Sequence, residues 1–172
     1  TTLEAYKAYS DYNGMAELVE LIFQKCSAIL GSDTIEYNGH TINLKPPFRR
    51  MSLPEEWLKI TGEDIHEVLK GKGFNRENLK KLASKLHVEH GADTTSAKIF
   101  DRIMDEKILG ALVQPTFVMD YPTAITPLAK CKAGDESLVE RFEFFAGAEE
   151  IANAYSELND PEDQKSRLVE QL

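Results

Sequence analysis

The segment from Arg141 to Pro161, RFEFFAGAEEIANAYSELNDP, constrains the fold of this chain more than any other. It has the character of two buried strands on either side of Gly147, and we predict an antiparallel hairpin with Ala146-Gly147 as a two-residue loop. Four glutamates nevertheless lie in this segment, and carboxylates are depleted from strands and costly to bury without a compensating positive charge. The hairpin therefore predicts a nearby cation.

The predicted loop places Glu150 directly opposite Glu143. Directly opposed residues share a face of the sheet, with Cβ atoms about 4.5–5.5 Å apart. Two like charges at that separation repel unless a cation lies between them. A hard divalent ion such as Mg²⁺ fits this chemistry and usually binds together with substrate phosphates. The alternatives are an exposed sheet edge with two hydrated carboxylates, or a register slipped by one residue, which would separate the pair.

A second set of polar residues follows in the same segment. Asn153, Tyr155 and Glu157 alternate along the strand and therefore share a face. An amide, a phenol ring and a carboxylate together could hold an ammonium group and pack its alkyl stem, although a solvated outer face is an equally simple interpretation. Strict alternation points this set away from Glu150, so a single pocket would require a bulge or bend near Ala152.

The N-terminal part of the chain alternates between strand and helix patterns. Residues 1–9 alternate as a strand would, with Glu4 and Tyr6 on one face. A helix is then predicted from a cap at Asn13 to a stop at Gly31, with Cys26 on its buried apolar stripe. The dipeptide Asn38-Gly39 tolerates the positive φ of a type I′ turn and predicts a hairpin.

Residues 45–110 predict a small helical insertion within the domain. Its helices start at Ser52, at Asn75, and at Thr95 or Ser96, all residue types that favour helix N-caps. Strands return from Pro115, and a last helix follows Asp160. The order β, α, ββ, small helices, βββ, α predicts an α+β fold, an antiparallel sheet flanked by helices.

Composition narrows the classes of function. The net charge of −9 argues against autonomous nucleic-acid binding. No apolar run reaches the roughly 20 residues of a membrane span. The two cysteines, Cys26 and Cys131, are far apart, which favours a reduced cytoplasmic setting over a disulfide framework.

Three stretches carry a family resemblance: TTLEAYKAYSDYNGM, PTFVMDYPTAITPLAK and RFEFFAGAEEIANAYSELNDPEDQ. Together they resemble the catalytic domain of class II lysyl-tRNA synthetases, over nearly the whole chain and in the same order. The aspartyl and asparaginyl enzymes share the architecture, but PLAK and NAYSELNDP are similar to the lysyl group. The resemblance implies that residues 1–172 are part of that domain, with 45–110 inserted in it. It also implies an ATP-dependent ligase that makes lysyl-adenylate and charges tRNA(Lys), as a cytoplasmic homodimer.

The resemblance also implies roles for individual residues. Glu143 and Glu150 match the carboxylates that hold Mg²⁺ on the ATP phosphates, and Glu4 lies on the ATP side. The lysine pocket is matched by Tyr6, Asn153, Tyr155 and Glu157, where Glu157 would pair with the substrate ammonium and Tyr155 would pack its stem. Such an enzyme needs no protein nucleophile, because it positions the lysine carboxylate against the α-phosphate and stabilises developing charge.

Other parts of the family pattern have no match in residues 1–172. These are the tRNA-anticodon domain, the first class signature, the ATP-clamping arginine of the second signature and the arginine signature of the third. We therefore expect this chain alone to be inactive in lysine-dependent ATP–pyrophosphate exchange. Two other functions remain open: a lysyl-synthetase-like ligase that modifies a translation elongation factor, and a non-catalytic protein-binding module.

Overall fold

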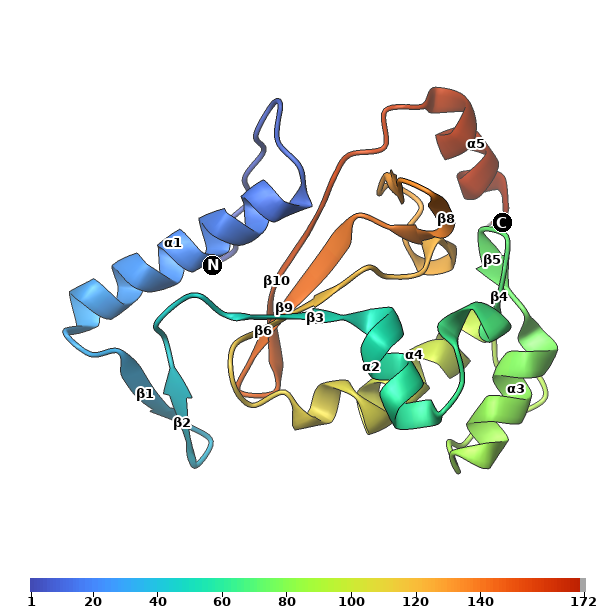
Figure 1. The fold of residues 1–172 in the computed structure, drawn as a ribbon, viewed down its shortest axis with the longest axis horizontal. Helices are drawn as coiled ribbons and strands as arrows, with labels where there is room; N and C mark the ends of the chain where they lie inside the picture. Colours follow the sequence, from blue (N-terminus) through green and yellow to red (C-terminus); the bar gives the residue numbers. More distant parts are fainter. Residues whose placement is uncertain (171–172) are drawn as a thin grey trace.

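The centre of the computed structural model, which describes residues 1–170, is a four-stranded sheet in the order β10-β9-β6-β3 (Figure 1). Its strands are β3 (Arg49–Ser52), β6 (Thr116–Met119), β9 (Arg141–Ala146) and β10 (Glu149–Tyr155). The pairs β10–β9 and β9–β6 are antiparallel, whereas β3 joins β6 in parallel. The predicted α+β class is confirmed, and the parallel edge strand makes the sheet mixed.

One face of the sheet packs against helix α1 (Tyr12–Leu30). Alternation along β9 turns Phe142 and Phe144 toward this helix, and both are fully buried. Phe117 of β6 lies between them, with ring centroids 5.0 Å from Phe142 and 4.5 Å from Phe144. Phe23 of α1 packs edge-on against Phe144 with ring centroids 5.1 Å apart, and this contact holds the helix against the strands.

The other face packs against helices α2 (Leu53–Thr61), α3 (Arg76–Lys85) and α4 (Ser96–Lys107). Trp57 of α2 stacks on Phe100 of α4 with centroids 5.1 Å apart, and this cluster includes Val118 and Phe145 of the sheet. Asn75 and Thr95 cap α3 and α4 through side-chain acceptors, as predicted. Ser52 occupies the predicted N-cap of α2, but its side chain makes no capping hydrogen bond.

The predicted helical insertion, residues 45–110, contains more than helices. It includes β3 of the central sheet, the two-residue strands β4 (Leu69–Lys70) and β5 (Gly73–Phe74), and the 3₁₀ helices η1 (Ile65–Val68) and most of η2 (Leu109–Ala111). Because β3 is hydrogen-bonded to β6, the start of this segment is continuous with the sheet. Its status as an insertion stays a prediction.

The predicted strand at residues 1–9 is wrong. Residues 1–11 form an exposed loop beside the start of α1 (Figure 1). An alternating segment forms a strand only where another strand supplies hydrogen-bond partners, and no segment within residues 1–170 pairs with this one. The cap of α1 also differs from the prediction, since Asp11 accepts from the Gly14 backbone N–H at 3.0 Å and Asn13 lies inside the helix.

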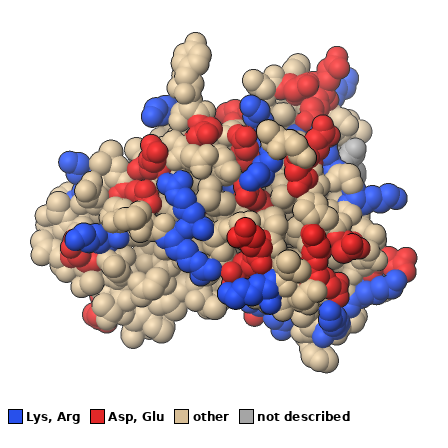
Figure 2. Space-filling view, viewed as in Figure 1, with Lys and Arg blue, Asp and Glu red and all other residues tan. Residues whose placement is uncertain are grey.

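The burial predicted for Cys26 is wrong as well. Val19 and Phe23, earlier on the same stripe, pack against the sheet, but Cys26 is exposed, as are Ile29 and Leu30. The second half of α1 extends past the sheet toward the hairpin of β1 (Thr34–Tyr37) and β2 (His40–Asn43) (Figure 1). This part of the surface carries few charges (Figure 2).

The predicted β1–β2 hairpin is confirmed. Its turn residues Asn38 and Gly39 have φ of 48° and 78°, the positive values that a type I′ turn requires.

The segment between β6 and β9 contains the 3₁₀ helix η3 (Thr123–Ile125) and the hairpin of β7 (Cys131–Lys132) and β8 (Asp135–Val139). Helix α5 (Pro161–Glu170) follows Asp160, whose Oδ1 accepts from the Glu162 backbone N–H at 3.0 Å, as a cap should. In residues 1–170, no helix combines the length and the apolar character needed to cross a membrane.

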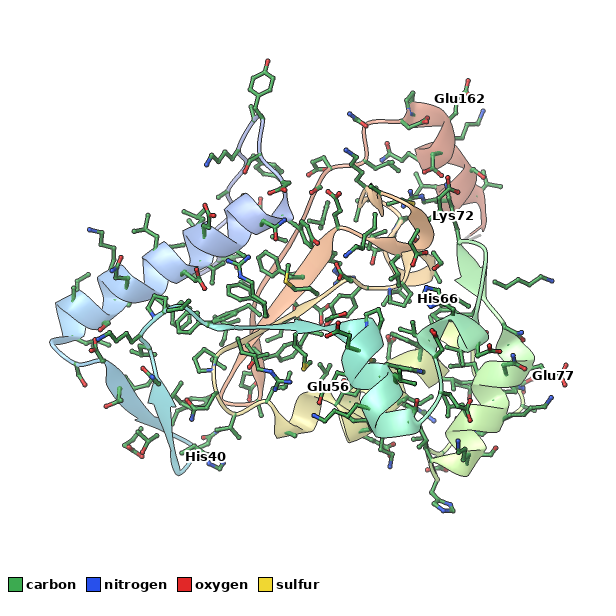
Figure 3. All side chains as sticks on the ribbon, viewed as in Figure 1. His40, Glu56, His66, Lys72, Glu77 and Glu162 are labelled. Atoms are coloured by element: carbon green, nitrogen blue, oxygen red, sulfur yellow. The ribbon has the colours of Figure 1, made fainter. Side chains whose placement is uncertain are left out.

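Buried Arg167 ties α5 to this segment. It donates to the Ala129 carbonyl at 2.7 Å and to Asp163 at 2.6 Å, and Lys72 also bonds Asp163 (Figure 3). These two cations lower the pKa of Asp163 to about 2.

The side chain of His66 (Figure 3) links η1 to β8. Its contacts lead us to predict that the stability of the fold depends on pH. Its Nδ1 lies 2.6 Å from Asp64 and its Nε2 2.9 Å from Asp135, and the hydrogen bond to Asp135, then that to Asp64, raises the pKa of His66. A folded-state pKa above the unfolded value of about 6.5 stabilises the fold fully below that pH, and this contribution disappears as pH rises through the folded pKa.

Thermal unfolding between pH 6 and 9 should therefore show a loss of stability that His66→Gln abolishes. The control His40→Gln, in the exposed β1–β2 hairpin, should keep the loss, and a pH profile unchanged by His66→Gln would contradict the linkage.

Candidate functional site

The site is built on the β9–β10 hairpin, whose turn differs from the predicted one. The turn residues are Gly147 and Ala148, with φ of 65° and 63°, rather than Ala146 and Gly147. The positive φ of both residues suits a type I′ turn. As a result Glu149 pairs with Ala146, and Glu150 pairs with Phe145.

Contacts from other segments explain this turn. The Gly147 N–H donates to the Val113 carbonyl at 2.8 Å, and the Ala148 N–H donates to the Leu112 carbonyl at 3.1 Å. A Cβ on Gly147 would lie 2.6 Å from Cδ1 of Tyr37 in the β1–β2 hairpin. The close approach of Tyr37 therefore leaves little room for a side chain at position 147, and the positive φ also favours glycine there.

The predicted direct pairing of Glu143 with Glu150 is wrong, because Glu143 lies opposite Asn153. A bulge between Glu150 and Ala152 leaves Ile151 without a partner and shifts the alternation by one residue. Residues opposed across the hairpin share a face, so the bulge brings Glu150 to the same face as Asn153 and Tyr155. The bulge that a single pocket requires near Ala152 is thus present.

Glu143 is compensated by an arginine that our sequence reasoning did not identify. Arg141 donates to Oε1 of Glu143 at 2.5 Å, and the Tyr121 hydroxyl donates to Oε2 at 2.7 Å. The side chains of Arg141 and Glu143 are only 13% and 14% exposed, so the pair is largely shielded from water. The sequence did contain a signal for this pair: Arg141 and Glu143 are two positions apart, a spacing that places both side chains on one face of a strand.

Tyr121 serves this pair as a neutral hydrogen-bond donor. Burial first, and then the negative charge of Glu143, raises the pKa of its hydroxyl, so it stays protonated. The Arg141 guanidinium lies over the Tyr121 ring, 4.9 Å from its centroid, within range of a cation–π interaction.

Glu150 is the second carboxylate of this face. Although the residue is exposed overall, partial desolvation of its carboxyl group raises its pKa, and the charge of Glu143 raises it further. Arg141 and a hydrogen bond from Asn153 oppose this effect. Asp101 of α4 also has a raised pKa, with desolvation, Asp105 and then Glu143 as causes. The structure thus gathers negative charge that one arginine does not fully balance.

The other end of this face brings three predicted residues together. Desolvation raises the pKa of Tyr155, and the nearby Glu157 and Tyr6 contribute to the increase. Glu157 is exposed, and its carboxylate forms no hydrogen bond or salt bridge within residues 1–170. Its backbone is nevertheless fixed, because Glu157 forms a bridge with Ala129. A positioned carboxylate without a partner therefore lies close enough to Tyr155 to affect its hydroxyl, and so does Tyr6.

The first turn of α1 fixes the end of the loop that carries Tyr6. The Tyr12 backbone N–H donates to Oγ of Ser156 at 3.0 Å, next to the Tyr155–Glu157 region. The Tyr12 hydroxyl donates to Asp120 at 3.1 Å, and Lys132 pairs with Asp120 at 2.6 Å. Tyr6 itself is 83% exposed. Glu4 is also exposed, and it makes no hydrogen bond or salt bridge with any other residue that the structure describes.

Asn153 connects the two ends of the face. Its Oδ1 accepts from Nε of Arg141 at 3.1 Å, so the amide oxygen already faces a cation. A substrate ammonium bound at the same oxygen would be repelled by the guanidinium. Asn153 therefore offers its NH₂ donors, and Glu157 is the better acceptor for an ammonium group.

The amino-acid sequence that forms this site matches a known protein family. The family described as "tRNA synthetases class II (D, K and N)" matches residues 1–172. The chain belongs to this family. The predicted resemblance is confirmed, as is the architecture that it implied.

Curated relatives of this class II synthetase chain include proteins named "Lysine--tRNA ligase". One from Prochlorococcus marinus (strain MIT 9211) is 42% identical over 98% of this chain and 33% of its own length. One from Thermoanaerobacter pseudethanolicus is 41% identical over 100% of this chain and 34% of its own length. One from Porphyromonas gingivalis (strain ATCC BAA-308 / W83) is 39% identical over 100% of this chain and 29% of its own length. The chain spans about a third of the length of these relatives.

Two carboxylates of this face are the residues that could contribute to holding a metal ion. No group of three or more His, Cys, Asp or Glu side chains within residues 1–170 is arranged to hold a metal ion. Glu143 and Glu150 share a face, and each oxygen of Glu143 accepts one hydrogen bond while keeping a second lone pair. This donor set fits a hard cation that takes its remaining ligands from elsewhere.

Proposed function

We propose that the protein containing this chain ligates lysine to tRNA(Lys) through a lysyl-adenylate formed with ATP. The observation that carries the proposal is the unpaired carboxylate of Glu157 near Tyr155, two residues beyond the end of the strand that carries Glu150. The names of the relatives support the same substrate. The proposal includes the domain organisation: residues 1–172 are part of a catalytic domain, and residues 45–110 are an insertion within it. It also includes a cytoplasmic location and assembly of the whole protein as a homodimer.

Lysine binds along the Tyr6–Glu157 end of the face. Glu157 accepts hydrogen bonds from the side-chain ammonium, and the rings of Tyr155 and Tyr6 pack the alkyl stem and favour the cation at its end. One N–H of Asn153 bonds Glu150, and the other is left to donate to an acceptor oxygen of the substrate. A carboxylate-ended side chain such as aspartate would be repelled by Glu157, so this end of the pocket selects a cationic substrate.

ATP binds along the Glu143–Glu150 end, with Glu4 assigned to the same side. Mg²⁺ is commonly held by one or two carboxylates together with substrate phosphates, and Glu143 and Glu150 supply that number. When bound, magnesium would neutralise phosphate charge during attack by the lysine carboxylate. The raised pKa of Glu150, caused first by desolvation and then by the charge of Glu143, supports this assignment, since a bound cation would favour the charged form of both carboxylates.

The chain's own residues act by positioning rather than by covalent chemistry. Glu157 and the phenol rings orient lysine, and the Arg141–Glu143–Tyr121 contacts hold one ATP-side carboxylate in a fixed direction. Holding two reactants in a productive geometry can by itself supply about 7–11 kcal/mol of the barrier reduction.

Lysine-dependent ATP–pyrophosphate exchange by the purified full-length protein tests the proposal. We expect exchange with lysine and none with aspartate or asparagine, the other amino acids of the family description. Charging of tRNA(Lys) in the same preparation separates this function from modification of an elongation factor. Exchange with aspartate, or magnesium and lysine failing to bind at all, would overturn the proposal, and the second result would favour a protein-binding module.

A further inference from the structure

Arg141 makes more side-chain contacts in the site than any residue that carries a predicted role. Its Nε donates to Asn153, one terminal nitrogen donates to Glu143 at 2.5 Å, and the other donates to Oγ1 of Thr126 at 2.9 Å. Its guanidinium also covers the ring of Tyr121. All three guanidinium nitrogens are therefore engaged.

These contacts join the two ends of the proposed site. Glu143 belongs to the ATP side and Asn153 to the lysine side, and the two residues are directly opposed in the hairpin. We infer that Arg141 is a positioning residue that keeps the lysine side and the ATP side in one geometry by bonding Glu143 and Asn153 at once. The inference rests on the proposed function and adds a residue that it does not assign.

Only arginine satisfies this arrangement. The guanidinium is planar and directs donors along three fixed directions, whereas a lysine ammonium is a compact point charge. Lysine at position 141 would keep a cation near Glu143 but would lose the simultaneous contacts with Asn153 and Thr126. The amide of Asn153 would then be free to rotate and to present its oxygen to the pocket.

The test compares Arg141→Lys with wild type in the full-length protein. We expect both the KM for lysine and the magnesium concentration for half-maximal exchange to rise by about tenfold or more, as loss of charge-assisted hydrogen bonds would give. If Arg141 only stabilised the fold, Arg141→Lys would lower kcat in proportion to the fraction of folded protein. The KM for lysine and the magnesium concentration for half-maximal exchange would then stay unchanged. The control Arg76→Lys, at an exposed position of α3 with one side-chain bond to the Ala92 carbonyl, should change neither constant.

Combination with Asn153→Ala sharpens the test. If Arg141 acts on lysine binding through Asn153, the double variant should raise the KM for lysine little beyond the larger single effect. Fully additive effects on this KM would overturn the link through Asn153. Lysine and magnesium constants that are both unchanged in an active Arg141→Lys protein would overturn the inference and leave the proposed function standing. A wild-type protein without lysine-dependent exchange would instead refute the proposed function.

A milder variant covers the case in which Arg141→Lys does not fold. Thr126→Val has nearly the same shape and removes only the hydroxyl that accepts from Arg141. We expect the same two constants to rise by about two- to tenfold, the range that loss of a single hydrogen bond gives. Unchanged constants in the folded Thr126→Val protein would contradict the inference.

Discussion

Glu143→Gln and Glu150→Gln should each slow adenylate formation by about a hundredfold or more in the full-length protein, because each removes a preorganised charge at the phosphates. Each should also raise the magnesium concentration required for half-maximal exchange. If the two carboxylates share one ion with ATP, they form a single functional unit. The double variant should then be far less impaired than the sum of the two losses, since one ion is lost only once.

Glu149→Gln is the matched control for this experiment. Glu149 is also exposed and adjoins Glu150 in β10, but it pairs with Ala146 on the opposite face of the hairpin. It should leave exchange and its magnesium dependence unchanged. Small, additive effects of Glu143→Gln and Glu150→Gln, within about 0.5 kcal/mol, would indicate two hydrated carboxylates at a sheet edge and refute the shared ion.

Tyr121→Phe separates charge from orientation at Glu143. This variant keeps the carboxylate and its bond to Arg141 but removes the hydroxyl donor at Oε2. Its effect should be smaller than that of Glu143→Gln, because the negative charge remains.

Glu157→Gln should raise the KM for lysine at least tenfold while changing the KM for ATP little. The substitution keeps the shape of the side chain but removes the charge opposite the substrate ammonium. Removing one partner of a buried charge pair typically costs about 2–5 kcal/mol, and the exposure of Glu157 in this structure places the expected effect toward the lower end. Initial rates of exchange at varied lysine and varied ATP measure both constants.

Glu162→Gln is the control for the lysine experiment. Glu162 is an exposed carboxylate in the first turn of α5, five positions further along the chain (Figure 3). It should leave the KM for lysine unchanged. A Glu157→Gln protein with the wild-type KM for lysine would remove Glu157 from the substrate pocket.

Local sequence patterns were sufficient where local hydrogen bonds decide the structure. The caps at Asn75 and Thr95 and the turn at Asn38-Gly39 depend on residues within a few positions, and they were predicted correctly. Alternation along β9 is of the same local kind: it places Phe142 and Phe144 on one face and Glu143 on the other, because the side-chain period of a strand is two.

Predictions that required a distant partner failed. Residues 1–9 have the alternation of a strand, but a strand exists only when a second one completes its hydrogen bonds. Cys26 lies on an apolar helix stripe, but burial depends on what packs against it, and the sheet ends before that turn of α1.

For the candidate site, too, some features follow from the sequence and others only from tertiary contacts. The sequence by itself nominated most of the residues that we propose for the chemistry, because the glutamates, Asn153 and Tyr155 follow a recognisable family pattern along one hairpin, but it did not nominate Arg141. Tertiary structure decided how they meet. Tyr37 and Val113 select Gly147-Ala148 as the turn, and the bulge at Ile151 brings Glu150 onto the face of Asn153. These outcomes depend on contacts between segments far apart in the chain, which no local pattern encodes.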